Sequence, residues 1–252
     1  MLYNRLEASK SVLRKFIVIT ENRYDKLMIR LNEQLKNPKE SFYDEEIWTF
    51  LLACGYAAGG QSGSDLLIRK LSKNKSIKDG KIFIEGLPVS PREARDEGKT
   101  HVDLAIGNIK LRQNTKGGIE LEVKENSFIN FCEAKWYSDI SKSVTYDQAR
   151  NQLIRIIDNA ICFQKEGKYA DKIMVTLITP EIFKSNVRKS RLYQYKFEDY
   201  LNDKNEILED LDLNQNRLKF RQNKKWKYPD NIPNRLKNLE LNWISYEKKT
   251  IF

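Results

Sequence analysis

The stretch Phe128-Ile129-Asn130-Phe131-Cys132-Glu133-Ala134-Lys135-Trp136 decides how the rest of this sequence is interpreted. An apolar run leads directly into an acid and a base, which predicts a strand over 128–136. Side chains alternate between the two faces of a strand, so Glu133 and Lys135 are expected on the same face. The elements around this strand then determine what the two charged groups can do.

A second carboxylate stands upstream in another strand-like run. Asp103 lies within His101-Val102-Asp103-Leu104-Ala105-Ile106-Gly107, and its apolar neighbours are expected to point to the other face. Four strands are predicted in this part of the chain, over 81–85, 101–113, 118–124 and 128–136. Turn residues separate the last three, which favours an antiparallel meander.

Apolar residues at helical spacing predict helices on both sides of these strands. Before them we expect one or two amphipathic helices over 1–42, a helix capped by Ser41 or Asp44 that ends near Gly55, a loop over 57–64 and a short helix to Leu71. After them we expect a helix over 143–166, a strand over 172–179, a helix over 196–210 and a strand over 239–246. This order predicts an α/β fold with a central mixed sheet flanked by helices.

The composition favours a folded protein with an anionic partner. The 45 Lys and Arg residues against 35 Asp and Glu residues give a formal charge of +10, which points to nucleic acid or an acidic membrane surface. No apolar run is long enough to span a membrane and the N-terminus lacks a secretory signal, so a cytoplasmic protein is expected. The three cysteines are widely spaced and there is one histidine, which disfavours a disulfide scaffold and a zinc site.

Two carboxylates and a lysine on rigid strands are the minimum equipment of a metal-dependent phosphodiesterase. Such an enzyme must activate a water, neutralise charge at phosphorus and stabilise a leaving alkoxide, and a divalent cation can serve all three needs. Carboxylate oxygens favour Mg²⁺, so Asp103 and Glu133 are the predicted ligands. Lys135 is expected to act on the water or the phosphate, and to lose part of its proton affinity if it is desolvated beside a metal.

The acid and lysine two residues apart form a weak motif by themselves. The spacing occurs six times in the chain, and Glu122 with Lys124 is the second-best pair. Only Glu133 and Lys135 follow an apolar strand, precede a long amphipathic helix and have an upstream acid in a strand. The alternative interpretation is an ordinary ion-pair set on the surface of a sheet, although two carboxylates amid apolar strands are costly to bury without a cation.

Residues 43–179 resemble the PD-(D/E)xK nuclease superfamily, which contains many Type II restriction endonucleases. The resemblance rests on Val102-Asp103, on Glu133-Ala134-Lys135 and on the element order, which corresponds to an α-β-β-β-α-β core. It implies that Asp103, Glu133 and the backbone carbonyl of Ala134 bind Mg²⁺ and that Lys135 acts on the water. Val102 replaces the usual proline, and the strand over 118–124 resembles an insertion, which leaves open which strand pairs with 128–136.

Three further residues are candidates for a role because of this resemblance. Many such nucleases add a glutamate from the helix before the sheet as a metal ligand, and Glu46 is the better match because Glu45 is expected to point away from the apolar face. The alternative for Glu46 is a charge favoured by the helix dipole. Gln148 and Gln152 resemble a glutamine that some families place near the site, and Gln148 is assigned to the DNA contact.

Two basic clusters are predicted to contact phosphates, with aromatic rings or polar groups available for bases. They contain Arg188, Lys189 and Arg191 in the first, and Arg217, Arg221, Lys224, Lys225, Trp226 and Lys227 in the second. The alternative for either cluster is a solvated basic surface.

These features predict a single nuclease domain over 1–252, made of an N-terminal helical extension over 1–42, a catalytic core over 43–180 and a basic C-terminal region over 181–252 for DNA contact. The leading hypothesis is a Mg²⁺-dependent, site-specific endonuclease of the restriction-modification type that cuts double-stranded DNA, as a homodimer with one active site for each strand. The alternatives are a structure-selective nuclease, such as a junction resolvase or repair enzyme, and a non-catalytic nucleic-acid-binding protein.

Overall fold

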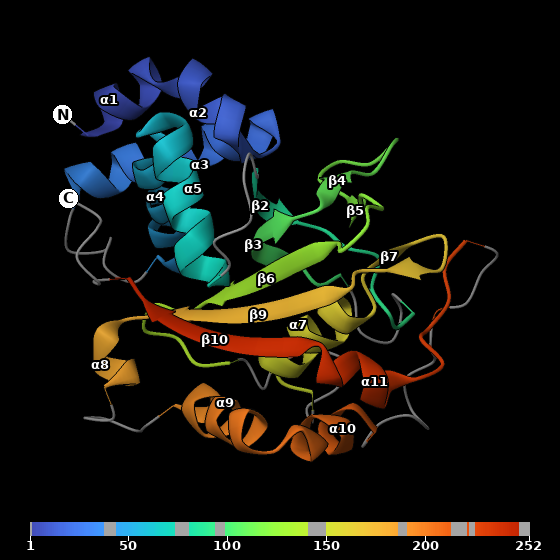
Figure 1. Ribbon diagram of the computed structural model, residues 1–252. Helices are drawn as coiled ribbons and strands as arrows, with labels where there is room; N and C mark the ends of the chain where they lie inside the picture. The colour runs from blue at the N-terminus through green and yellow to red at the C-terminus, as the bar shows by residue number, and fades with distance from the viewer. Residues whose placement is uncertain are drawn as a thin grey trace.

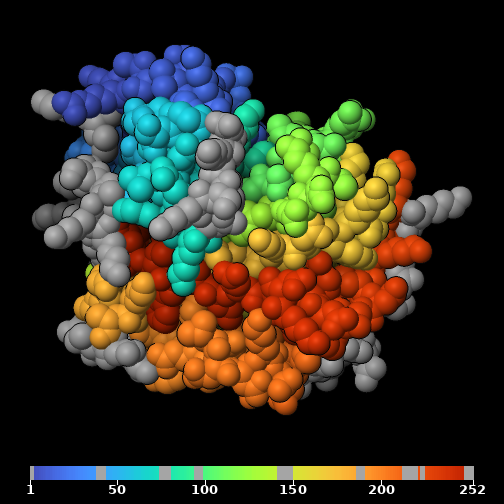
Figure 2. Space-filling model, in the orientation of Figure 1, coloured from blue at the N-terminus to red at the C-terminus, as the bar shows by residue number. Residues whose placement is uncertain are grey.

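A six-stranded mixed sheet forms the centre of the protein, with helices on both faces (Figure 1). The structure is a computed structural model that describes residues 2–37, 44–73, 81–93, 99–140, 150–185, 191–212, 221 and 225–246. Figure 2 shows the layers on one face of the molecule, with the N-terminal helices in blue and cyan at one end and α9 and α10 in orange at the other. The predicted α/β class is therefore confirmed.

The strand order places the two motif-bearing strands next to each other. The sheet runs β1 (Ile17–Val18), β2 (Ile82–Gly86), β3 (Val102–Gly107), β6 (Phe128–Ala134), β9 (Lys172–Thr179) and β10 (Leu239–Ser245). The β2–β3 and β3–β6 pairs are antiparallel, and the other pairs are parallel. Because β1 and β10 belong to this sheet, the N-terminal and C-terminal parts of the chain each add a strand to the core.

The predicted strand over 101–113 breaks at Gly107. This glycine has φ 123°, and a Cβ there would lie 2.2 Å from the carbonyl oxygen of Phe128, so only glycine fits. Beyond it, β4 (Ile109–Leu111) and β5 (Ile119–Leu121) form a separate antiparallel hairpin. The insertion-like strand therefore leaves the central sheet, and β3 is the antiparallel neighbour of β6.

In the part of the chain that the structure describes, one face of the sheet is covered by α1 (Leu2–Ala8), α2 (Lys10–Phe16), α3 (Glu21–Lys36), α4 (Glu45–Ala57) and α5 (Gly60–Ser72). Asp44 caps α4, as predicted, because its carboxylate accepts a hydrogen bond from the Ile47 N–H at 3.2 Å. The loop expected over 57–64 was wrong, since α5 already begins at Gly60. A Cβ at Gly63 would lie 2.0 Å from the Tyr56 carbonyl oxygen, so this glycine serves close helix contact rather than a loop.

The opposite face carries α7 (Gln152–Ile161), α8 (Glu181–Lys184), α9 (Leu192–Asn202), α10 (Lys204–Asp212) and α11 (Ile232–Lys237). The helix predicted over 143–166 is shorter within the described residues. Asn151 caps α7 by accepting from the Ile154 N–H at 2.9 Å, and a hairpin of β7 (Gln164–Lys165) and β8 (Lys168–Tyr169) follows its end. The helix predicted over 196–210 is two helices that meet at Asp203.

A single backbone oxygen joins α5 to three strands. The Leu71 carbonyl accepts hydrogen bonds from the side chains of Asn130 at 2.8 Å, Thr176 at 2.8 Å and Asn242 at 2.9 Å, which lie on β6, β9 and β10. All three donors are buried. A buried polar group that loses its partner is costly, so this cluster holds the end of α5 against the sheet.

A buried charge cluster on the other face joins distant parts of the chain. The Asp158 carboxylate accepts from Arg92 Nε at 3.0 Å and from Arg150 Nη2 at 2.7 Å, and the Tyr228 hydroxyl donates to it at 3.3 Å. Asp158 and Arg92 are 0 % exposed. The C-terminal region is therefore bound to the core through α7.

Candidate active site

The pairing of β3 with β6 brings Asp103 next to Glu133. Leu104 pairs with Cys132 in this antiparallel register, so Asp103 and Glu133 are the next opposed positions. The Asp103 Oδ2 atom accepts a hydrogen bond from the Ala134 N–H at 2.7 Å. Lys135 Nζ lies 3.0 Å from Glu133 Oε1. The three side chains predicted from separate parts of the sequence thus converge at one end of the two strands.

Glu45, the first residue of α4, joins this group. Its Oε1 atom accepts from Lys135 Nζ at 2.9 Å, and its Oε2 atom accepts from the Trp136 N–H at 2.9 Å. The Ser138 hydroxyl also donates to Oε2. One carboxylate therefore holds the lysine and the chain that follows it.

The expectation that Glu45 points away is wrong, because Glu45 contacts Lys135, whereas the assignment of Glu46 as a metal ligand stays a prediction. Glu46 lines a neighbouring hollow of about 560 Å³ together with Asp103, but Arg23 and Arg30 form ion pairs with its carboxylate. The helical face of α4 did not predict this arrangement because the helix meets the site with its first turn. The position of a first-turn side chain depends on where the helix end lies, not on the apolar stripe.

A pocket of about 240 Å³ lies over these groups. Its lining comprises Glu45, Lys99, Thr100, His101, Asp103, Glu133, Lys135, Gln152, Arg155 and Ile156. Gln152 is the first residue of α7, and Arg155 donates through Nη2 to Thr100 Oγ1 at 2.9 Å. Gln152 thus reaches the predicted site, whereas Gln148 lies outside the described residues.

Burial and mutual repulsion disfavour the charged forms of the two strand carboxylates. Desolvation raises the pKa of Asp103 well above its usual value, and the charge of Glu133 raises it further. Desolvation also raises the pKa of Glu133, while the Lys135 ammonium opposes this shift. Two neighbouring carboxylates that resist ionisation form a place where an added positive charge is favourable.

Lys135 remains a cation in this setting. Its burial opposes the charge, but the carboxylates of Glu133, Asp103 and Glu45 outweigh desolvation, so its pKa is raised above the usual value. The expected loss of proton affinity beside a metal stays a prediction. Lys135 has three neighbouring carboxylates and is only 3 % exposed.

The oxygen donors fit a hard divalent cation. Asp103 and Glu133 supply two carboxylates, and the Ala134 carbonyl is the third oxygen that the resemblance implies. Among the residues that the structure describes, no group of three or more His, Cys, Asp or Glu side chains is arranged to hold a metal. The set that the resemblance implies, a pair of carboxylates with a backbone oxygen, would suit an ion such as Mg²⁺ that keeps several waters.

In the described parts of the two basic clusters, the lysines and the arginines differ in exposure. Lys225 and Lys227 are exposed. Arg191 lies with its guanidinium 5.1 Å from the centre of the Phe183 ring, and Arg221 donates through Nε to the Ser90 carbonyl at 3.0 Å. Both arginines are half-buried and take part in contacts within the fold.

Trp226 requires a correction. Its ring is 6 % exposed and belongs to the core around α7, so it does not offer a face to a base. A tryptophan within a basic stretch can bury its apolar ring in the core while the lysines around it remain exposed to solvent. Arg188, Lys189, Arg217 and Lys224 lie outside the described residues.

Two site residues were missed in the sequence. Arg155 follows Gln152 by three residues, which places both on one side of a helix, and that spacing could have identified it. Glu45 carries no comparable signal, because its position depends on the angle at which α4 approaches the sheet.

Comparison with known proteins adds no relative. No family model, no curated protein and no solved structure matches the chain. The resemblance to PD-(D/E)xK nucleases therefore rests on the motif residues and on their arrangement. Within the described residues, no helix is long and apolar enough to cross a membrane.

Proposed function

We propose that the protein is a Mg²⁺-dependent endonuclease that hydrolyses phosphodiester bonds in duplex DNA. The observation that supports this most strongly is the meeting of Asp103, Glu133 and Lys135 in one pocket at the end of two paired strands. A surface ion-pair set accounts for it poorly, because Glu133 and Lys135 are only 4 % and 3 % exposed. Buried charges at this density favour a functional site over a stabilising one.

The residues divide the chemistry between them. When bound, a divalent cation would neutralise charge on the phosphate and lower the pKa of a water. Lys135 contributes a lasting positive charge and N–H donors toward the phosphate or the attacking water. Glu45 positions Lys135 through the bond at 2.9 Å, and Arg155 adds a second cation to the pocket wall. In this arrangement, the fixed positive groups of Lys135 and Arg155 would stabilise the negative charge that develops on the phosphate oxygens in the transition state.

The substrate and assembly follow from charge and resemblance. The formal charge of +10 favours a polyanion such as DNA. The proposal includes site-specific cutting of the restriction type, by a homodimer in which each active site cuts one strand.

The decisive experiment is digestion of long unmethylated duplex DNA with Mg²⁺, followed by sequencing of the ends. We expect Asp103→Asn, Glu133→Gln and Lys135→Met each to lower the cleavage rate by roughly 100-fold or more, while DNA binding in Ca²⁺ persists. Glu122→Gln and Lys124→Met are matched controls, because these residues form an exposed ion pair at 3.0 Å with the same sequence spacing. Undiminished cutting by the three site variants would refute the proposal.

The products also separate the alternatives. Discrete fragments from linear duplex support a restriction enzyme, whereas preferential cutting of branched or single-stranded DNA supports a resolvase or repair nuclease. Salt-sensitive binding without any Mg²⁺-dependent product would support a non-catalytic nucleic-acid-binding protein.

A further inference from the structure

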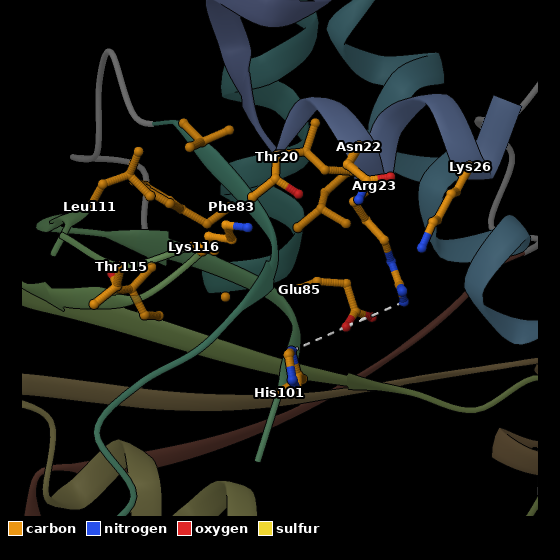
Figure 3. A pocket seen from close by; sticks show the side chains of 16 residues that line it. Thr20, Asn22, Arg23, Lys26, Phe83, Glu85, His101, Leu111, Thr115 and Lys116 are labelled. Carbon is orange, nitrogen blue, oxygen red and sulfur yellow. Dashed lines mark ion pairs between the residues drawn. The ribbon is translucent and has the colours of Figure 1, made fainter. Parts of the chain in front are cut away.

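A second pocket, of about 500 Å³, lies beside the candidate active site (Figure 3). One wall is α3 and the other is the β4–β5 hairpin, with β2 between them. His101 lines both this pocket and the active-site pocket, and Glu85 lines both this pocket and the hollow that contains Asp103. The second pocket is therefore continuous with the surroundings of the proposed catalytic groups but contains none of them.

The floor of this pocket is apolar. Phe83 and Ile119 are buried beneath it, at 4 % and 1 % exposure. Leu111 on the hairpin is 53 % exposed, which leaves an uncovered apolar surface at the mouth. Cavities of this size and character suit a ligand with a flat apolar part.

The rim of the pocket carries a lysine on each wall. Lys26 projects from α3, and Lys116 comes from the turn of the hairpin on the other side (Figure 3). Both are exposed, and no ion pair joins either amine to another part of the chain that the structure describes. Arg23 differs, because it already pairs with Glu46 and with Glu85, the latter at 3.6 Å.

The acidic residue of the pocket does not cancel these charges. Glu85 lies 3.6 Å from Arg23 and 3.5 Å from His101 Nδ1, so its carboxylate faces other partners. The two lysines are consequently available for an anionic ligand. A ligand with two anionic groups on either side of an apolar ring would fit this pocket, because each anionic group can contact the lysine of one wall while the ring lies on the apolar floor.

We propose that this pocket binds one unpaired nucleotide of a nucleic-acid strand. The base lies against Phe83, Ile119 and Leu111, and the phosphates on its two sides contact Lys26 and Lys116. This inference rests on the proposed nuclease function for the identity of the strand, since the pocket adjoins the catalytic groups at His101. It implies that the strand enters with a base removed from the stack, because the faces of a base within a duplex are covered by its neighbours and cannot lie against these side chains.

The test is a binding titration with thymidine 3′,5′-bisphosphate in EDTA, with thymidine as the comparison ligand. Loss of a charged contact weakens binding by roughly tenfold, and we expect this for Lys26→Glu and for Lys116→Glu. Lys237→Glu is the matched control, because Lys237 is exposed on α11 and does not line the pocket. Thymidine should bind more weakly than the bisphosphate.

Absence of binding, or equal binding by the two pocket variants and the Lys237→Glu control, overturns the inference. Thermal unfolding of all three variants should match the unsubstituted protein, because the lysines are exposed. The Asp103→Asn variant separates this inference from the nuclease proposal, since it should keep the bisphosphate affinity while losing cleavage. If the bisphosphate binds in a lysine-dependent way but the protein never cuts DNA, the pocket inference is supported and the nuclease proposal is refuted. If the protein cuts DNA but shows no such binding, the nuclease proposal is supported and the pocket inference is refuted.

Discussion

The Asp103 carboxylate accepts a hydrogen bond from the Ala134 N–H at 2.7 Å, across the pair of strands that also carries Glu133. This bond fixes the position of Asp103, and it engages the Oδ2 atom with the backbone of the Glu133-Ala134-Lys135 motif. The strand pairing consequently holds the two carboxylates next to each other. Their repulsion is a permanent property of the fold, and it has measurable consequences.

Stability should fall as the pH rises because of Asp103. Its pKa is raised in the folded protein, so the folded state retains a proton that the unfolded chain has lost. The resulting stabilisation is complete below the ordinary aspartate pKa and is lost as the pH rises through the folded-state pKa. We expect the stability advantage of Asp103→Asn over the unsubstituted protein to grow as the pH rises above the ordinary aspartate pKa of about 3.9, as measured by urea unfolding in EDTA. Glu125→Gln, an exposed change, should show no such trend, and a constant advantage would contradict the prediction.

Removal of the Lys135 charge should destabilise the protein near neutral pH. Lys135→Met leaves the carboxylates of Glu133 and Glu45 without their common partner, which costs about 3 kcal/mol of unfolding free energy. Addition of Glu133→Gln should recover part of this loss while cleavage stays absent. Chemical denaturation measures both effects. If Lys135→Met alone were as stable as the unsubstituted protein, the lysine would not compensate the charge of these carboxylates.

The Asp158 cluster should be the more sensitive structural site. Asp158→Asn removes the carboxylate that pairs with the buried guanidinium groups of Arg92 and Arg150, and we expect a loss of about 3 kcal/mol or more. The exposed Asp230→Asn change serves as the control and should stay within about 0.5 kcal/mol. Equal midpoints in urea for the two variants would be the contrary result.

The glycines of α4 and α5 should respond in opposite directions to alanine. A Cβ at Gly55 meets nothing within 4 Å, so Gly55→Ala should stabilise the helix by about 1 kcal/mol. A Cβ at Gly63 would overlap the Tyr56 carbonyl oxygen at 2.0 Å, so Gly63→Ala should lower the melting temperature. Thermal unfolding monitored by circular dichroism compares the two. A stabilising Gly63→Ala would show that the helices separate readily.

Local patterns predicted where most of the strands lie, but not the break at Gly107 or the separate hairpin of β4 and β5, which depend on contacts with distant parts of the chain. Asp103, Glu133 and Lys135 could be assigned in this way, since a central strand determines which face each residue occupies. Glu45 could not, because its contact with Lys135 depends on the packing of α4. Trp226 was misinterpreted for a related reason, since the charges around it describe the surface while its own ring lies in the core. Gly63 appeared to mark a loop, but its role becomes visible only when Tyr56 is placed beside it.

The Leu71 carbonyl, with its three donors from β6, β9 and β10, defines the stationary end of the α4–α5 pair. Ala58 and Gly59 turn the chain back between these helices, so Glu45 begins at the same sheet-side end at which Leu71 finishes. Separating this end of α5 from the sheet is costly, because it would remove three buried hydrogen bonds to the Leu71 carbonyl. The Glu45 carboxylate, which accepts from Lys135 Nζ at 2.9 Å, therefore belongs to a helix pair that is anchored to the sheet by a buried hydrogen-bond cluster.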